Sequence, residues 1–94
     1  MAKSILSTEH CCYFCGSHNW PEEHHIFGGA NRKNSEKYGL KVYLCHWCHN
    51  EPPNGVHHNK ALRLHLQSIA QQKAMDTYEW TEDDFRKIFG KNYL

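Results

Sequence analysis

The sequence predicts a single small α+β domain, and three observations lead to that prediction. The chain has 94 residues, a length at which apolar burial alone builds only a modest core. Patterns typical of short strands lie in the first half of the chain, and patterns typical of helices lie in the second half. Two C-x2-C pairs, at residues 12–15 and 45–48, have the spacing with which cysteines grip one ion. We therefore expect a zinc-stapled domain, with Cys12, Cys15, Cys45 and Cys48 as ligands of a closed structural site.

The number of cysteines and the N-terminal residues favour a metal site over disulfides. The chain has five cysteines, which suits four ligands and one spare, and Cys11 is the spare because Cys12 and Cys15 have the ligand spacing. Residues 1–8 contain no apolar run and no later segment could span a membrane, so we expect no signal peptide, no membrane span and a cytoplasmic location. In a reducing cytoplasm such pairs bind metal more often than they form disulfides. The alternative is a set of buried free thiols.

Two strands are expected between the cysteine pairs. Cys12 begins a tight turn that ends at Gly16, where we expect a positive φ angle. Residues 22–27 predict a short strand, and residues 31–35 predict a polar loop after it. Residues 40–44 predict a clearer strand, in which one face carries Leu40, Val42 and Leu44. We expect the two strands to pair antiparallel across the loop.

Two helices are expected after the second cysteine pair. Residues 51–55 contain two prolines and predict a loop. Asn59 is a suitable N-cap for a helix that runs to about Met75, with an apolar stripe of Leu62, Leu66, Ile69 and Ala70. Thr81 opens a final helix with Asp84 completing a capping box, and Gly90 ends it after a buried face of Phe85, Ile88 and Phe89. The single domain, residues 1–94, then has a core at about 11–76 and a terminal helix at about 81–90.

Basic residues cluster between the two expected strands. The formal net charge of +1 is too small to indicate a nucleic-acid partner by itself. The cluster consists of Arg32, Lys33, Lys37 and Lys41, with few acidic residues among them. Such a cluster is often only a solvated surface, but beside a metal site it favours phosphate binding.

The pair His24-His25 lies in the first expected strand. Adjacent strand residues face opposite sides, so the two rings cannot bind one ion side by side. One ring can bind a metal while the other points at a substrate, provided that the strand is twisted there. The alternative is two surface histidines on a short strand.

These elements together resemble the HNH endonucleases. The resemblance rests on His24-His25-Ile26, a glycine-bearing loop, and the segment Leu44-Cys45-x2-Cys48-His49. It is closest to phage-type recombination-enhancement nucleases, and it extends from the first cysteine turn through the helix after Asn59. The terminal residues 89–94 also look similar. The resemblance implies a ββα-metal fold and a DNA endonuclease activity, with a recombination or phage protein as a further partner.

The resemblance also implies site residues. His24 matches a metal-binding position, His25 the general base and His49 the closing metal-binding histidine. This sequence departs from the family where an asparagine is usual, because Leu40 occupies that position, and Asn31 or Asn34 would have to orient the base instead.

A second departure concerns the helix, which in many members follows the C-x2-C-H element directly. Here Pro52-Pro53 intervenes, so His57 is an extra candidate ligand. The alternative is that His57 is a solvent-facing histidine at the helix start.

The expected reaction is hydrolysis of DNA phosphodiesters with little sequence selectivity. One catalytic divalent ion, Mg²⁺, Mn²⁺, Ni²⁺ or Zn²⁺, would be held by His24, His49 and His57, beside the structural Zn²⁺. Contacts to the DNA backbone would come from Arg32, Lys33 and Lys37. A non-catalytic zinc-binding nucleic-acid module is the alternative, and a protein-interaction domain built on the zinc site is a third interpretation.

Overall fold

The computed structural model describes residues 4–7, 9–18, 20–49 and 55–94, and its centre is a two-stranded sheet. Strand β1 (Glu22–His25) pairs antiparallel with β2 (Lys41–Leu44). The register pairs Glu22 with Leu44, Glu23 with Tyr43, His24 with Val42 and His25 with Lys41. The expected antiparallel pairing is confirmed, and so is the mixed α+β class.

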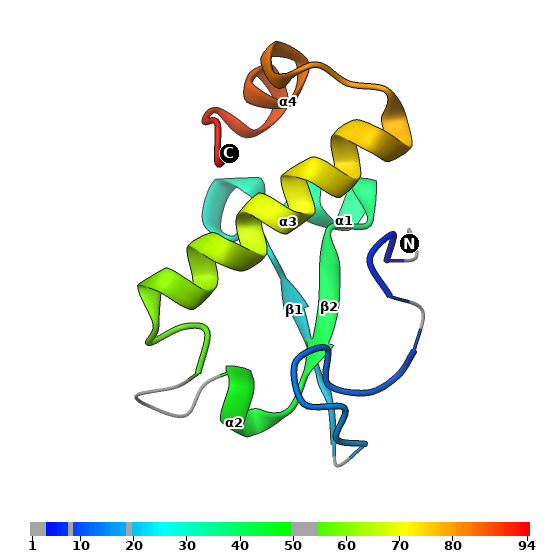
Figure 1. Cartoon of the computed structure of the whole chain (residues 1–94), viewed down its shortest axis with the longest axis vertical. Coiled ribbons are helices and arrows are strands. Elements are labelled where there is room, and N and C mark those ends of the chain that lie inside the picture. The colour runs from blue at the N-terminus through cyan, green and yellow to red at the C-terminus, as the bar shows by residue number, and fades with distance from the viewer. Residues whose placement is uncertain (1–3, 8, 19, 50–54) are drawn as a thin grey trace.

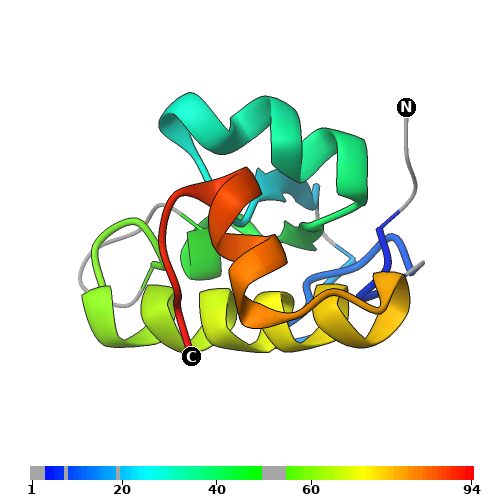
Figure 2. The same cartoon turned by 90° about the horizontal axis from the view of Figure 1, so that it is seen from above.

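Helices lie on both sides of this hairpin. The 3₁₀ turn η1 (Gly29–Asn31) and helix α1 (Arg32–Tyr38) connect the strands, α2 (His46–His49) follows β2, and α3 (Lys60–Tyr78) and α4 (Glu82–Phe89) complete the chain. The long helix α3 crosses the hairpin diagonally, while α2 lies at the opposite end of the hairpin from α1 and α4 (Figure 1). Seen from above, α3 runs along one side of the hairpin and α1 along the other (Figure 2). The sheet is thus enclosed between helices.

The expected polar loop at residues 31–35 is wrong, because these residues form the end of η1 and most of α1. The sequence of α1 has no apolar stripe, and its buried residue is Ser35. Tertiary hydrogen bonds hold it in place: the side-chain amides of Asn31 and Asn34 donate to the carbonyls of Phe89 and Ile88 at 2.8 and 3.1 Å. Helix α1 therefore owes its position to α4, far away in the sequence.

The strands are also shorter than expected. β1 ends at His25 rather than residue 27, although Ile26 N–H still donates to the Leu40 carbonyl at 3.0 Å. At Phe27 the main-chain N–H and carbonyl both bond to the Ser35 hydroxyl instead, which ends the ladder. β2 begins at Lys41, one residue after the expected start.

The two C-terminal helices form as expected. The Asn59 side chain caps α3 by accepting from Leu62 N–H at 3.0 Å, and α3 continues three residues beyond the expected end, to Tyr78. Thr81 and Asp84 form the capping box of α4, and Gly90 ends α4 at φ 83°. The first cysteine turn likewise has Gly16 at φ 75°. Of the loop expected at 51–55, residues 51–54 lie outside the described residues.

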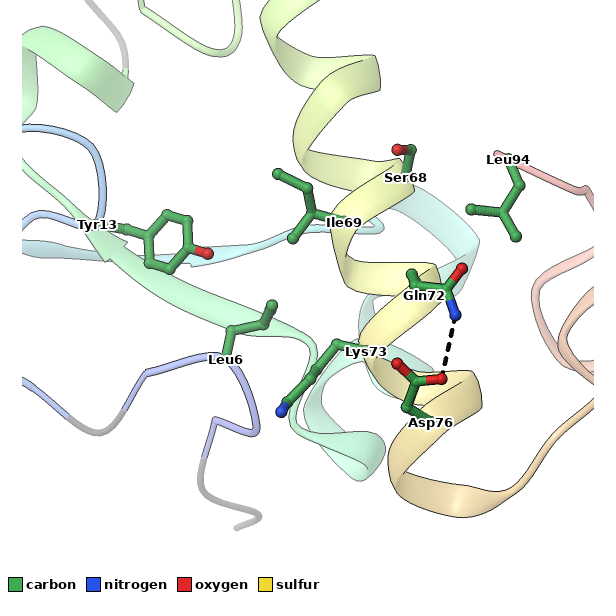
Figure 3. A pocket seen from close by; sticks show the side chains of 8 residues that line it. All are labelled: Leu6, Tyr13, Ser68, Ile69, Gln72, Lys73, Asp76 and Leu94. Carbon is green, nitrogen blue, oxygen red and sulfur yellow. Dashed lines mark hydrogen bonds between the residues drawn. The ribbon is translucent and has the colours of Figure 1, made fainter.

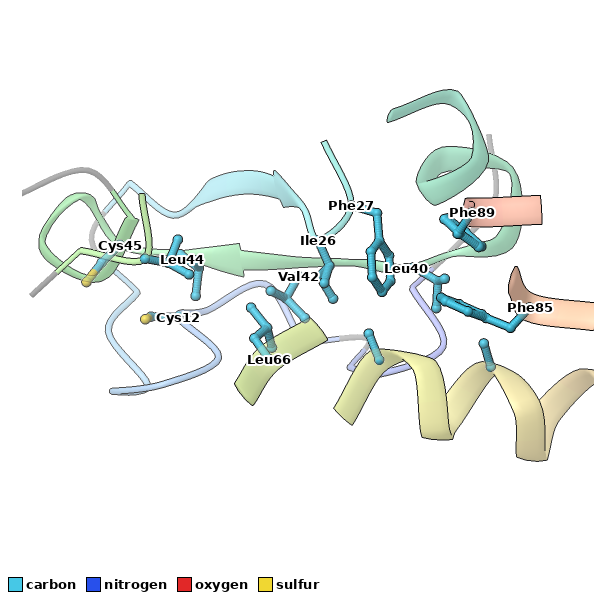
Figure 4. Packing of buried hydrophobic residues seen from close by; sticks show 13 residues of the cluster. Cys12, Ile26, Phe27, Leu40, Val42, Leu44, Cys45, Leu66, Phe85 and Phe89 are labelled. Carbon is cyan, nitrogen blue, oxygen red and sulfur yellow. The ribbon is translucent and has the colours of Figure 1, made fainter. Parts of the chain in front are cut away.

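The hydrophobic core lies between the hairpin and helices α3 and α4. At its centre, Leu66 of α3 points toward Val42 of β2, and Cys12 and Cys45 close the end nearest α2 (Figure 4). The opposite end is filled by Phe27, Phe85 and Phe89 (Figure 4). The centroid of the Phe27 ring lies 5.4 Å from that of Phe85 and 4.8 Å from that of Phe89. The core thus has an aromatic end and an end closed by cysteines.

Candidate metal centres

Four cysteines meet at the end of the hairpin that carries α2. We call Cys12, Cys15, Cys45 and Cys48 the cysteine cluster; each offers one sulfur, and these atoms all lie within 4.8 Å of one another. The Sγ atoms of Cys15 and Cys45 are 3.5 Å apart, and sulfurs bound at 2.3 Å around a tetrahedral zinc stand about 3.8 Å apart. The expected four-ligand geometry is therefore present, while Cys11 lies outside it, with its thiol directed at Glu9.

The main chain around Cys12 favours the thiolate form of this residue. Cys15 N–H points at the Cys12 sulfur at 3.5 Å. Burial opposes ionisation, but main-chain N–H groups from Cys45, Cys15 and Phe14 lower the pKa of Cys12 to about 6. Burial and the neighbouring thiols Cys45 and Cys12 raise the pKa of Cys48. Four thiols crowded in this way ionise together only when a cation compensates their charge, so the donor set fits zinc.

Three histidines converge on a second point. We call His24, His49 and His57 the histidine cluster, and one ring nitrogen of each lies within 4.8 Å of the other two. The Nε2 atoms of His49 and His57 are 2.9 Å apart, and two nitrogens bound at 2.0–2.1 Å to one tetrahedral ion stand about 3.3 Å apart. Three candidate ligands from the sequence are thus brought together, including His57.

The local fold explains how these three rings meet. His24 is on β1 and buried, and His49 is the last residue of α2. Two main-chain hydrogen bonds bring His57 close to α2. Val56 N–H donates to the Cys48 carbonyl at 2.7 Å, and His57 N–H donates to the His49 carbonyl at 3.2 Å. Since Val56 is fully buried, it anchors the turn that presents His57.

The ring of His24 is buried and neutral, as a ring that could bind a cation has to be. Burial, reinforced by His49 and His57, lowers the pKa of His24 to about 3, so its ring is neutral at physiological pH. Its Nε2 is buried, and among the described residues no hydrogen-bond partner reaches it. An unpaired buried polar atom costs about 1–3 kcal/mol, and an ion bound at the cluster would satisfy it. Partial burial and the neighbouring His49 also lower the pKa of His57.

Comparison of the chain with known protein families, with curated proteins and with solved structures finds no significant match. Within the parts of the chain that the structure describes, no helix is long and apolar enough to cross a membrane.

His25 lies on the opposite face of β1 from the histidine cluster. Its Nε2 is 3.7 Å from Glu23 Oε1 and 3.6 Å from Glu36 Oε1. Lys41, opposite His25 on β2, is buried and pairs with both carboxylates, at 3.3 Å from Glu23. The Lys41 ammonium already supplies the cation that these two carboxylates need, so we interpret the group as an ion-pair network.

The basic residues expected to contact DNA lie on α1. Arg32, Lys33 and Lys37 are exposed. Arg32 and Lys33 line a pocket of about 560 Å³ together with His25. Lys41 differs from them, because it is buried in the ion-pair network.

The asparagines expected to orient His25 have other partners. As described above, Asn31 and Asn34 bond to carbonyls of α4, and Leu40 is fully buried in the core. The carboxylates of Glu23 and Glu36 are the polar groups found beside His25. Alternation along β1 places Glu23 on the same face as His25, whereas the contact with Glu36 depends on α1.

A second pocket, of about 510 Å³, lies between the N-terminal segment and α3, and no member of either cluster lines it. Leu6 and Tyr13 face Ile69 across it, and Gln72 bonds to Asp76 at its rim at 3.1 Å (Figure 3). Its lining offers no group of metal-binding side chains among the described residues.

Proposed function

We propose that this chain is a metal-dependent DNA endonuclease in which the histidine cluster holds the catalytic divalent ion and His25 is the general base. The observation that carries the proposal is the convergence of three imidazoles at a point separate from the four cysteines. Structural zinc sites use four protein ligands, whereas catalytic sites commonly use three and keep a position open. A three-nitrogen cluster beside a four-sulfur cluster fits one structural ion and one working ion.

The order of the residues along the chain supports the same reaction. Ligand and base are adjacent at His24-His25, and the closing ligand His49 directly follows the last cysteine, which is the pattern that resembles the HNH endonucleases. The exposure of His57 supports an open site, since a substrate can approach from that side. Imidazole ligands suit Zn²⁺ and Ni²⁺ better than Mg²⁺, so we expect the softer ions to act at lower concentration.

The proposed chemistry follows from the charge of the substrate. An ionised phosphodiester repels nucleophiles, and a divalent ion in the histidine cluster would neutralise charge on a non-bridging oxygen and on the leaving 3′-oxygen. His25 takes a proton from the attacking water, whose oxygen bonds to phosphorus as the bond to the 3′-oxygen breaks. Because His24 and His25 leave β1 on opposite faces, the phosphate has to lie along the edge of β1 away from β2 to meet both.

The basic side chains near His25 fit backbone binding. Arg32 and Lys33 line the same pocket as His25, so they can hold phosphates next to the one that is cut. Contacts of this kind position DNA without reading its sequence. We therefore propose a nuclease of low sequence selectivity.

The alternative is a non-catalytic zinc-binding nucleic-acid module, and one observation favours it. The amides of Asn31 and Asn34 bond to α4, so neither orients His25. A general base without a fixed orientation is less effective. A chain that uses only its cysteine cluster and its basic helix would bind DNA without cutting it.

A plasmid-nicking assay distinguishes the proposed nuclease from the non-catalytic binding module. Wild type is tested with Mg²⁺, Mn²⁺, Ni²⁺ and Zn²⁺, beside His25→Ala, His49→Ala and the control His65→Ala, which alters an exposed residue of α3. His25→Ala should keep DNA binding and metal uptake while cleavage falls by about 10²–10⁴-fold. His49→Ala should lose cleavage together with the second ion, and His65→Ala should cut normally.

The pattern of results decides between the functions. If no divalent ion supports nicking by wild type and the chain still binds DNA, the chain is a binding module. If His25→Ala cuts as fast as wild type, the base is misassigned.

A further inference from the structure

We infer that Glu22 is a positioning residue for the histidine cluster: it fixes the ring of His49 so that Nε2 faces the ion. This inference rests on the proposed metal site. Glu22 Oε1 lies 2.9 Å from His49 Nδ1.

The position of Glu22 follows from the register of the hairpin. Residues two apart on a strand share a face, so Glu22 lies on the same face of β1 as His24. Glu22 pairs with Leu44, the last residue of β2, and α2 begins two residues later. Its side chain therefore reaches the end of α2, where His49 lies.

Hydrogen-bond chemistry then assigns the two nitrogens of His49. An ionised carboxylate can only accept, so the Nδ1 that it contacts carries the hydrogen. In the neutral ring the lone pair is then on Nε2, the atom that lies 2.9 Å from His57 Nε2. Metal-binding histidines commonly donate their second N–H to a carboxylate, which fixes the tautomer and the ring orientation. One ring thus joins the Glu22 carboxylate to the cluster.

The competing interpretation is an ordinary surface ion pair. The Glu22 side chain is 41 % exposed and that of His49 is 13 % exposed, and exposed pairs contribute little. An ion pair depends on the charge of Glu22, whereas positioning depends on its acceptor oxygen. Glutamine removes the charge and keeps the oxygen, so Glu22→Gln and Glu22→Ala should differ only if Glu22 positions the ring.

Glu23 provides a matched control. It is the next residue of β1, and its carboxylate contacts His25 and Lys41 on the opposite face. Glu23→Gln therefore removes a nearby negative charge without touching the histidine cluster. Its affinity for the second ion should equal that of wild type.

The test is calorimetric titration with Co²⁺ of full-length protein whose cysteine cluster already holds zinc. Glu22→Ala should weaken binding of the second ion by about 10–100-fold, the usual effect of losing such a partner, and Glu22→Gln should weaken it less. Long-range ¹H–¹⁵N spectra of the zinc-loaded protein, recorded without a second ion, should show His49 protonated at Nδ1 in wild type and a mixture of tautomers in Glu22→Ala. Retention of one zinc and of the melting transition shows that each variant is folded.

The outcomes separate this inference from the proposed function. If wild type takes up no second ion, the metal site itself is wrong. If wild type binds Co²⁺ and the two Glu22 variants bind it with the same affinity as each other, the site stands and the positioning role of Glu22 is overturned.

Discussion

The Ser35 hydroxyl bonds to both main-chain groups of Phe27: it accepts from Phe27 N–H at 3.0 Å and donates to the Phe27 carbonyl at 2.8 Å. Ser35 is fully buried, and Phe27 is 1 % exposed, so water does not substitute for either bond. The contact joins α1 to the chain two residues after His25. It is thus a structural support of the segment that carries the proposed base.

We expect Ser35→Ala to destabilise the protein strongly. The change leaves a buried N–H and a buried carbonyl without partners, and each such group costs about 1–3 kcal/mol. The free energy of unfolding should fall by about 2–6 kcal/mol, measured by urea denaturation of the zinc-loaded protein. Ser68→Ala, a half-buried serine on α3, is the control and should change it by less than about 0.5 kcal/mol. Equal effects of the two changes would contradict the prediction.

Protein purified without added metal should contain about one tightly bound zinc per chain, as expected for four cysteine ligands. Chelation should unfold it, because a core of this size depends on the cross-link. Cys48→Ser should lose the zinc, whereas Cys11→Ser, which alters the thiol outside the cluster, should keep it. A full cooperative melting transition in the chelated chain would contradict the prediction that the fold needs zinc.

Replacement of Arg32 and Lys33 by alanine should weaken DNA binding to a similar extent on unrelated sequences. Each lost phosphate contact should also reduce the slope of log affinity against log salt by about 0.9. The control is Lys73→Ala, which removes an exposed charge from α3. Binding that is unchanged, or that becomes selective for sequence, would show that Arg32 and Lys33 are not phosphate contacts.

The ion pair between Glu36 and Lys41 should make the stability of the fold decrease at low pH. The hydrogen bond from Lys41 holds the pKa of Glu36 below its usual value. The contribution of a carboxylate with a lowered pKa is complete above the unfolded-state value of about 4.3 and is lost as the pH falls through the folded-state value. Wild type should therefore lose stability more steeply than Glu36→Gln below about pH 4.3.

The same variant should be less stable than wild type at pH 7, where the ion pair is intact. Asp83→Asn is the control, because its pair with Arg86 is exposed and contributes little. Thermal melting between pH 3 and pH 7 measures both effects. If Glu36→Gln and wild type lose stability in parallel, the ion pair does not contribute to acid sensitivity.

The sequence predicts those parts of the fold that local rules determine. The cap of α3 at Asn59 and the capping box of Thr81 and Asp84 depend on side chains that bond within one turn, so spacing reveals them. The alternation of apolar residues in β2 identifies the strand in the same way. The cysteine cluster is predictable because C-x2-C spacing has few other uses.

The rest depends on contacts between distant residues. Helix α1 lacks a periodic apolar face. Hydrogen bonds hold it to α4, and their partners lie 54 and 58 positions further along the chain. The contact of Glu22 with His49 spans 27 positions. A weak signal for it was present, since Glu22 lies two residues before His24 and so shares its face. Only the register of the hairpin shows that this face also meets α2.

The cysteine cluster also links the stability of the fold to the supply of metal. Cys15 and Cys45 are 30 positions apart, so a bound ion would close a loop of this length, and the loop opens again when the chain unfolds and releases the ion. An ion provides this link reversibly, so the folded fraction rises with the concentration of free zinc. Where zinc is buffered at low concentration, metal supply sets how long this chain resists proteolysis, because proteases act on the unfolded form.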